Sequence, residues 1–139
     1  FQCALGISQL KKIDDFVKRR RYLASIYYKK LKNNKHIILP KIINETEHSF
    51  HLFPIQIKFS KKINKKKLFK IFLKNKIKLQ VHYKPTHLFS LYKKKFNFKN
   101  GDFPNAELFY KREFSLPIFY SLSLKNINKV CNLLNKHLT

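Results

Sequence analysis

The sequence predicts a small α+β domain in which helices pack on one face of a mostly antiparallel sheet. The chain has 139 residues, of which 44% are hydrophobic and 15% aromatic, so one domain with a real core is expected. The predicted strands are few and short, and helices separate them. No internal repeat is present. This order of elements is typical of helices layered on a small antiparallel sheet.

Residues 1–34 carry apolar side chains at steps of three and four, which predicts one long helix that ends at Asn33-Asn34. No proline interrupts this pattern. A helix of this length needs a partner along it, which suits an element that joins two domains or lines a dimer contact. We therefore expect an interdomain helix over residues 1–34 and a small α+β domain over residues 35–139.

The next elements are extended. Residues 37–43 predict a short extended run broken at Pro40, residues 44–48 a polar turn, and residues 50–59 a strand. Pro54 lies inside that strand and indicates an edge position or a bulge.

The middle of the chain predicts an amphipathic helix over residues 60–75, with Asn64 as its N-cap. Its inward side chains are expected to be Ile63, Leu68, Ile71 and Phe72. We then expect a strand over residues 76–83, a loop and short helix over residues 86–98, and a turn at Asn100-Gly101.

The last third predicts a helix over residues 104–112 that starts at Pro104, and a short edge strand over residues 114–119. Ser123 is expected to cap a final helix over residues 124–138. Its inward side chains are Ile127, Val130, Cys131, Leu134 and Leu138.

The chain is strongly basic: 31 Lys+Arg against 7 Asp+Glu give a net charge of +24. Such a charge is typical of nucleic-acid binding, and lysine runs at residues 65–67 and 93–95 are interleaved with phenylalanines. Phe72, however, belongs to a core stripe. Arginine, which leads in phosphate and base recognition, is limited to Arg19, Arg20, Arg21 and Arg112. We favour the alternative that the positive charge reflects coding bias. An AT-rich genome enriches lysine, isoleucine and asparagine, and a solvent-exposed face only has to be polar.

The two cysteines, Cys3 and Cys131, lie in apolar helical contexts and are expected to be buried free thiols in a reducing, cytoplasmic compartment. No apolar run reaches the roughly 18 residues of a membrane span, and no signal peptide opens the chain. The sequence contains no methionine and starts within an apolar stretch. We therefore expect a C-terminal piece of a longer protein.

The segment Gln80–His87, QVHYKPTH, holds the one close His–Tyr–His grouping of the sequence. Loops that follow strand ends commonly build sites, and imidazole and phenol groups hydrogen-bond sugar hydroxyls or phosphate oxygens. The alternative is a Tyr–His pair that only closes a strand end. The sequence has no HExxH, no Cys/His spacing typical of zinc, no Gly-rich phosphate loop and no GxSxG. It therefore contains no self-contained catalytic set and predicts no metal site.

Four segments together resemble the DegT/DnrJ/EryC1/StrS sugar aminotransferases, in the order and spacing of that family. They are FQCALGISQLKKIDDFVKRR at 1–20, HLFPIQIKF at 51–59, QVHYKPTHLFSLYKKKF at 80–96 and GDFPNAELFYKREFSLPIF at 101–119. The first is most similar to the branch that aminates UDP-linked 4-keto sugars for pseudaminic acid.

The resemblance implies the small C-terminal domain of a fold-type-I transferase that uses pyridoxal phosphate (PLP) and moves an amino group from glutamate to a nucleotide-linked keto sugar. In this family the cofactor lysine lies on the large N-terminal domain, so residues 1–139 alone are expected to be inactive. The resemblance also implies a homodimer and substrate-side roles for His82 and Tyr83, and more weakly for His87 and His51. The rival interpretations are a small basic nucleic-acid-binding module and an independent interaction domain.

Overall fold

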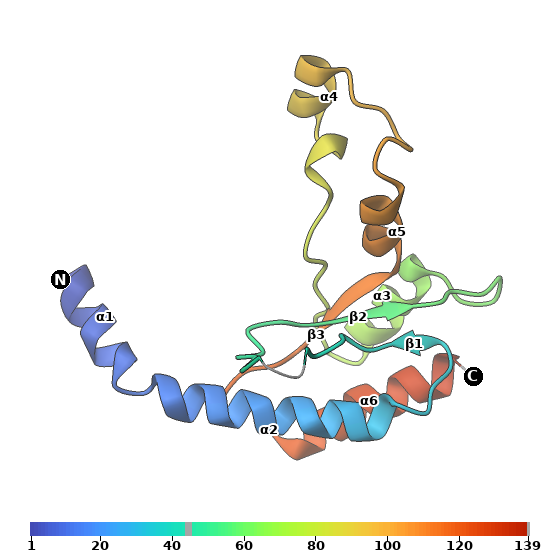
Figure 1. The fold of residues 1–139 in the computed structure, drawn as a ribbon. Coiled ribbons are helices and arrows are strands. Elements are labelled where there is room, and N and C mark those ends of the chain that lie inside the picture. Colours follow the sequence, from blue (N-terminus) through green and yellow to red (C-terminus); the bar gives the residue numbers. More distant parts are fainter. Residues whose placement is uncertain (44–45, 139) are drawn as a thin grey trace.

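The computed structural model describes residues 1–43 and 46–138. Within these residues, three strands form one antiparallel sheet in the order β1-β2-β3, and the chain also forms six α-helices (Figure 1), which confirms the α+β class. The elements follow the chain as α1 (Gln2–Leu10), α2 (Ile13–Leu31), β1 (Ile37–Ile38), β2 (Phe53–Ile57), α3 (Lys65–Lys74), the 3-10 turn η1 (Thr86–Leu88), α4 (Ser90–Phe96), α5 (Pro104–Arg112), β3 (Glu113–Leu116) and α6 (Leu124–Leu138).

The predicted long helix is two helices, and the expectation of an uninterrupted one is wrong. The break lies at Lys11-Lys12, where Lys12 has φ −110° and ψ 0° and its N–H donates to the Gln9 carbonyl at 3.0 Å. α2 restarts with Asp14 and Asp15 in its first turn, where carboxylates are favourable at the positive end of the helix dipole. Apolar periodicity continues across the break and therefore does not reveal it.

β2 is the central strand, yet Pro54 lies where β2 has a strand partner on one side only, so the alternative of an edge position is confirmed locally and the alternative of a bulge is not. Its register pairs Pro54 with Ser115 of β3, whereas β1 pairs only with residues 56 and 57. The strand therefore lacks a β1 partner beside Pro54, and a residue without an N–H is accommodated there.

Residues 76–83 do not form the predicted strand. Their one ladder contact among the described residues is a bridge between Gln80 and Ser115, in which the Ser115 N–H donates to the Gln80 carbonyl at 2.9 Å. Two residues later, the His82 N–H donates to the Glu113 side chain instead of to the β3 backbone. A side-chain acceptor thus replaces the next step of the ladder.

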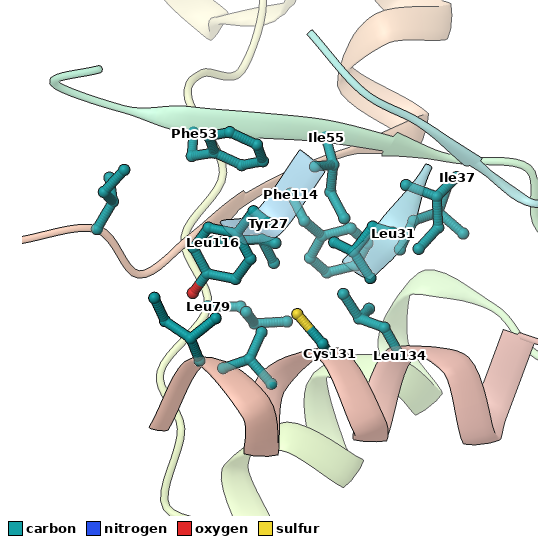
Figure 2. Close-up of a cluster of buried hydrophobic side chains, with 14 of the residues drawn as sticks. Tyr27, Leu31, Ile37, Phe53, Ile55, Leu79, Phe114, Leu116, Cys131 and Leu134 are labelled. Carbon is teal, nitrogen blue, oxygen red and sulfur yellow. The ribbon is translucent and has the colours of Figure 1, made fainter. Parts of the chain in front are cut away.

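The core lies between the sheet and the layer of α2 and α6, which run side by side across one sheet face (Figure 1). Figure 2 shows buried side chains, among them Phe53, Ile55 and Leu134, between the sheet and α6. Alternate β2 residues, Phe53, Ile55 and Ile57, are fully buried on this face, as period-2 geometry requires. Tyr27 of α2 donates its hydroxyl to the Pro117 carbonyl at 2.9 Å, and burial raises its pKa. The five side chains predicted to line the inner face of α6 are all buried.

Local signals located several helix starts correctly. The Asn64 side chain accepts the Lys67 N–H at 2.9 Å, Pro104 begins α5, and Ser123 Oγ accepts the Asn126 N–H at 3.3 Å. The predicted turn contains Gly101 at φ 101°. Of the predicted polar turn at residues 44–48, residues 44 and 45 lie outside the described residues.

Residues 84–112, which we call the arm, project away from the sheet (Figure 1). The arm contains η1, α4 and α5, and neither α4 nor α5 has a buried residue. Large apolar side chains are exposed along it, namely Phe89, Leu91, Tyr92, Phe96, Phe103, Leu108 and Phe109.

The two cysteines differ, contrary to the expectation that both are buried. Cys3 on α1 is exposed, whereas Cys131 on α6 is buried, and burial raises the pKa of the Cys131 thiol to about 11. Because the thiolate is the nucleophile, we expect iodoacetamide at pH 8 to modify one thiol per chain quickly and the second only after denaturation. Intact-mass spectrometry checks this, and Cys3→Ser should abolish the fast modification. Equal rates for both thiols would contradict the burial of Cys131.

Candidate functional site at the base of the arm

Two polar residues of β3 are buried on the sheet face opposite α2 and α6. The register places Phe114 and Leu116 beside Ile55 and Phe53 in the core, so Glu113 and Ser115 point to the other face. Glu113 is 0% exposed and Ser115 5%. Buried polar groups need hydrogen-bond partners, and the segment at residues 80–83 supplies them.

The partners form a short chain of hydrogen bonds that ends on His82. Ser115 Oγ donates to Glu113 Oε1 at 2.7 Å, and Glu113 Oε2 accepts the backbone N–H of His82 at 3.0 Å. The His82 side chain joins the same group, because its Nδ1 lies 2.7 Å from Ser115 Oγ. Both the backbone and the ring of His82 are therefore held by β3.

Lys65 places a positive charge next to this group. Its Nζ donates to the Tyr110 carbonyl and lies 4.8 Å and 5.3 Å from the ring centroids of Tyr110 and Phe114. Burial lowers the pKa of Lys65, and the Glu113 carboxylate opposes that shift. The ammonium group thus partly compensates the buried carboxylate.

Tyr83 lies directly beside His82 at the surface. The two rings meet edge to face with centroids 4.7 Å apart, and the peptide bond that joins the residues is cis. Tyr83 is 72% exposed, while His82 is partly buried. The pair offers an imidazole and a phenol together at the foot of the arm.

His87 lies within the arm and is 6% exposed. Its Nε2 is 2.9 Å from Glu107 Oε1, which also accepts the Gly101 N–H at 2.8 Å. The His87 ring packs against Phe103 with centroids 4.7 Å apart. His87 therefore ties η1 to the start of α5, and its ring is engaged inside the arm.

His51 is exposed, and its Nδ1 lies 3.3 Å from a guanidinium nitrogen of Arg20 on α2. The structure thus brings His82 and Tyr83 together and gives His87 and His51 separate partners. Sequence reasoning missed Glu113, Ser115 and Lys65. The polar–apolar alternation of Glu113–Leu116 was the available signal, since it separates the two sheet faces.

The pKa of Glu107 is lowered by the hydrogen bond from the Gly101 N–H and then by that from His87. A depressed carboxyl pKa contributes stability that is present above the unfolded pKa and lost as the pH falls through the folded pKa. We expect the melting temperature to fall below about pH 4.5, the ordinary glutamate range, and Glu107→Gln to weaken this dependence. Circular-dichroism melts from pH 3 to 6 check this, with the exposed Glu47→Gln as control. An unchanged pH slope in Glu107→Gln would contradict it.

The comparisons with known proteins decide the family. The model of the DegT/DnrJ/EryC1/StrS aminotransferase family matches residues 1–135. The chain belongs to this aminotransferase family. A UDP-4-amino-4,6-dideoxy-N-acetyl-beta-L-altrosamine transaminase of Campylobacter jejuni is 40% identical over 124 residues, which is 89% of this chain and 32% of that protein.

The chain is also similar to a second relative in sequence and to a solved structure in fold. An uncharacterized protein of Methanocaldococcus jannaschii, MJ1066, is 40% identical over 97% of this chain and 35% of its own length. The structure of Helicobacter pylori PseC, an aminotransferase involved in the biosynthesis of pseudoaminic acid, superposes with a TM-score of 0.87 at 32% identity. That superposition covers 99% of this chain and 36% of PseC. The chain thus spans about a third of the length of the relatives that it matches.

Within residues 1–43 and 46–138, no helix combines the length and apolar character needed to cross a bilayer. The same residues also contain no cluster of three or more His, Cys, Asp or Glu side chains that could hold a metal ion.

Proposed function

We propose that residues 1–139 form the C-terminal part of a PLP-dependent enzyme that transfers an amino group from glutamate to a UDP-linked 4-keto-6-deoxy sugar. Its product would enter pseudaminic acid and thereby surface polysaccharide or flagellin. The observation that carries this proposal is the similarity across nearly the whole chain to the Campylobacter jejuni transaminase and to PseC. A cytoplasmic homodimer is part of the same proposal.

In this proposal, residues 1–34 connect a large domain to the small domain at residues 35–139. The described residues do not fit the role of holding the cofactor. Lys65 is the lysine with a lowered pKa. Its Nζ, however, donates a hydrogen bond to the Tyr110 carbonyl and lies over two aromatic rings. We therefore assign the cofactor lysine to the large domain and expect residues 1–139 alone to be inactive.

The contribution of this chain is then recognition of the nucleotide sugar. His82 and Tyr83 present a ring nitrogen and an exposed phenol side by side, and such groups hydrogen-bond sugar hydroxyls and phosphate oxygens. Substrate-side roles for His87 and His51 remain predictions. The engaged ring of His87 supports a role in shaping the arm.

The test uses the full-length protein encoded by the reading frame that contains residues 1–139. We expect glutamate-dependent amination of a UDP-linked 4-keto sugar, a higher KM for the sugar nucleotide in His82→Ala and Tyr83→Ala, and little change in the exposed control His48→Ala. Residues 1–139 alone should show no turnover. A full-length protein that binds PLP but aminates no nucleotide-linked keto sugar would refute the substrate assignment.

The second candidate, nucleic-acid binding, is favoured by the net charge of +24. Three of the four arginines are already engaged within the molecule. Arg19 donates to the carbonyls of Tyr120 and Leu122, Arg20 lies against His51, and Arg21 donates to the His48 carbonyl and to Glu47. Phe72 is buried and unavailable for base stacking. A salt titration distinguishes the two, because a specific binder keeps a sequence or structure preference as its affinity falls with salt.

A further inference from the structure

We propose that Glu113 and Ser115 are positioning residues that hold neutral His82 in its Nδ1–H tautomer and leave Nε2 as a hydrogen-bond acceptor. The tautomer follows from the hydrogen bonds alone. Its use toward a substrate rests on the proposed function.

Glu113 is the buried end of the chain of hydrogen bonds. Both oxygens of Glu113 receive a donor, Oε1 from the Ser115 hydroxyl and Oε2 from the His82 backbone N–H. An ionised carboxylate only accepts hydrogen bonds. The two hydrogen bonds that reach Glu113 are those of a carboxylate that accepts at both oxygens.

The hydroxyl of Ser115 has one proton, and Glu113 Oε1 takes it at 2.7 Å. Ser115 Oγ can then only accept from His82 Nδ1, which lies 2.7 Å away. The proton of a neutral imidazole therefore resides on Nδ1. This arrangement resembles the way a carboxylate or carbonyl partner fixes the tautomer of a histidine through its second nitrogen.

The other ring nitrogen then carries a lone pair. Nε2 of His82 has no hydrogen-bond partner in the parts of the chain that the structure describes, residues 1–43 and 46–138. An unprotonated Nε2 accepts from a hydroxyl and does not donate to a phosphate oxygen. We infer that neutral His82 selects a hydroxyl donor of the ligand, and that the diphosphate is recognised elsewhere.

Glu113→Gln gives a sharp test because it should reverse the direction of the hydrogen bonds that run from His82 through Ser115 to residue 113. The backbone N–H of His82 still needs an acceptor, so the glutamine oxygen should take the Oε2 position and its NH2 group should face Ser115. Ser115 Oγ then accepts from the amide and donates to Nδ1. His82 should switch to the Nε2–H tautomer.

The measurement is 15N solid-state NMR of sedimented, 15N-histidine-labelled full-length protein at pH 8.5, about two units above the ordinary histidine pKa. Subtraction of the His82→Gln spectrum assigns the His82 signals. We expect a protonated Nδ1 and an unprotonated Nε2 in the unmodified protein, the reverse in Glu113→Gln, and a mixture of tautomers in Ser115→Ala. Glu47→Gln is the matched control and should leave His82 unchanged.

An unprotonated Nδ1 in the unmodified protein would overturn the proposal. So would an Nδ1–H tautomer that persists in Glu113→Gln while the other histidine signals show an intact fold. If Glu113→Gln does not fold, Ser115→Ala decides, and an unchanged His82 spectrum in that variant overturns the proposal. The result is independent of turnover, so an inactive full-length protein with the expected tautomers refutes the function and leaves the positioning role standing.

Discussion

Replacement of Phe114 by alanine is expected to lower the free energy of unfolding by about 3–5 kcal/mol, the usual range for a buried phenylalanine. Phe114 is 0% exposed and packs against Phe59 and Phe69 with ring centroids 6.0 and 5.0 Å away. The Lys65 ammonium also lies over its ring. Since domains of this size have stabilities of roughly 5–15 kcal/mol, this single change should remove a large part of the total. Urea denaturation followed by circular dichroism measures it.

Leu73→Ala is the matched control. Leu73 lies on α3 and is 65% exposed. Its replacement should change stability by no more than about 0.5 kcal/mol, as is usual for surface positions. A loss below about 1 kcal/mol for Phe114→Ala would be inconsistent with the packing described, because even the smallest cavities left by large side chains cost more.

The second large effect concerns association. Residues 1–139 produced on their own are expected to self-associate through α1, which has no buried residue and exposes Leu5, Ile7 and Leu10. Contiguous exposed apolar surface favours contacts between molecules. Burying two leucines contributes about 3 kcal/mol or more, so Leu5→Glu combined with Leu10→Glu should weaken association at least about 100-fold. Sedimentation velocity over a concentration series checks this.

Leu91→Glu on the arm is the control for that experiment, because Leu91 is also exposed but lies on α4. If this variant dissociates the chain and the α1 variant does not, the arm and not α1 forms the contact. If residues 1–139 without substitutions sediment as a monomer at every concentration, the prediction of self-association is wrong.

The parts of the fold that sequence predicted well are those set by neighbouring residues. The Asn64 cap, Pro104 at the start of α5 and the inward stripe of α6 depend on spacings of a few residues. The strand expected at residues 76–83 does not form, for the opposite reason. The conformation of this segment depends on Glu113, a residue more than thirty positions away in the sequence whose side chain accepts the His82 N–H.

The candidate site shows the same division. His82 and Tyr83 could be proposed from the sequence because they are adjacent in an unusual local grouping. Glu113 and Ser115 were not, since they lie 31 and 33 residues from His82. Their alternation with Phe114 and Leu116 indicates only that they face away from the core. The segment that covers them was itself predicted as a regular strand, so their burial was not foreseen.

The three consecutive arginines of α2 have a mechanical consequence. Successive residues of a helix point about 100° apart, so Arg19, Arg20 and Arg21 leave α2 in different directions. They reach the loop at residues 120–122, His51, and residues 47–48. Contacts spread in this way oppose rotation of α2 about its own axis, and α2 should move with these loops as one rigid body. A change in the orientation of α1 relative to α2 is then expected at the two-residue break at Lys11-Lys12.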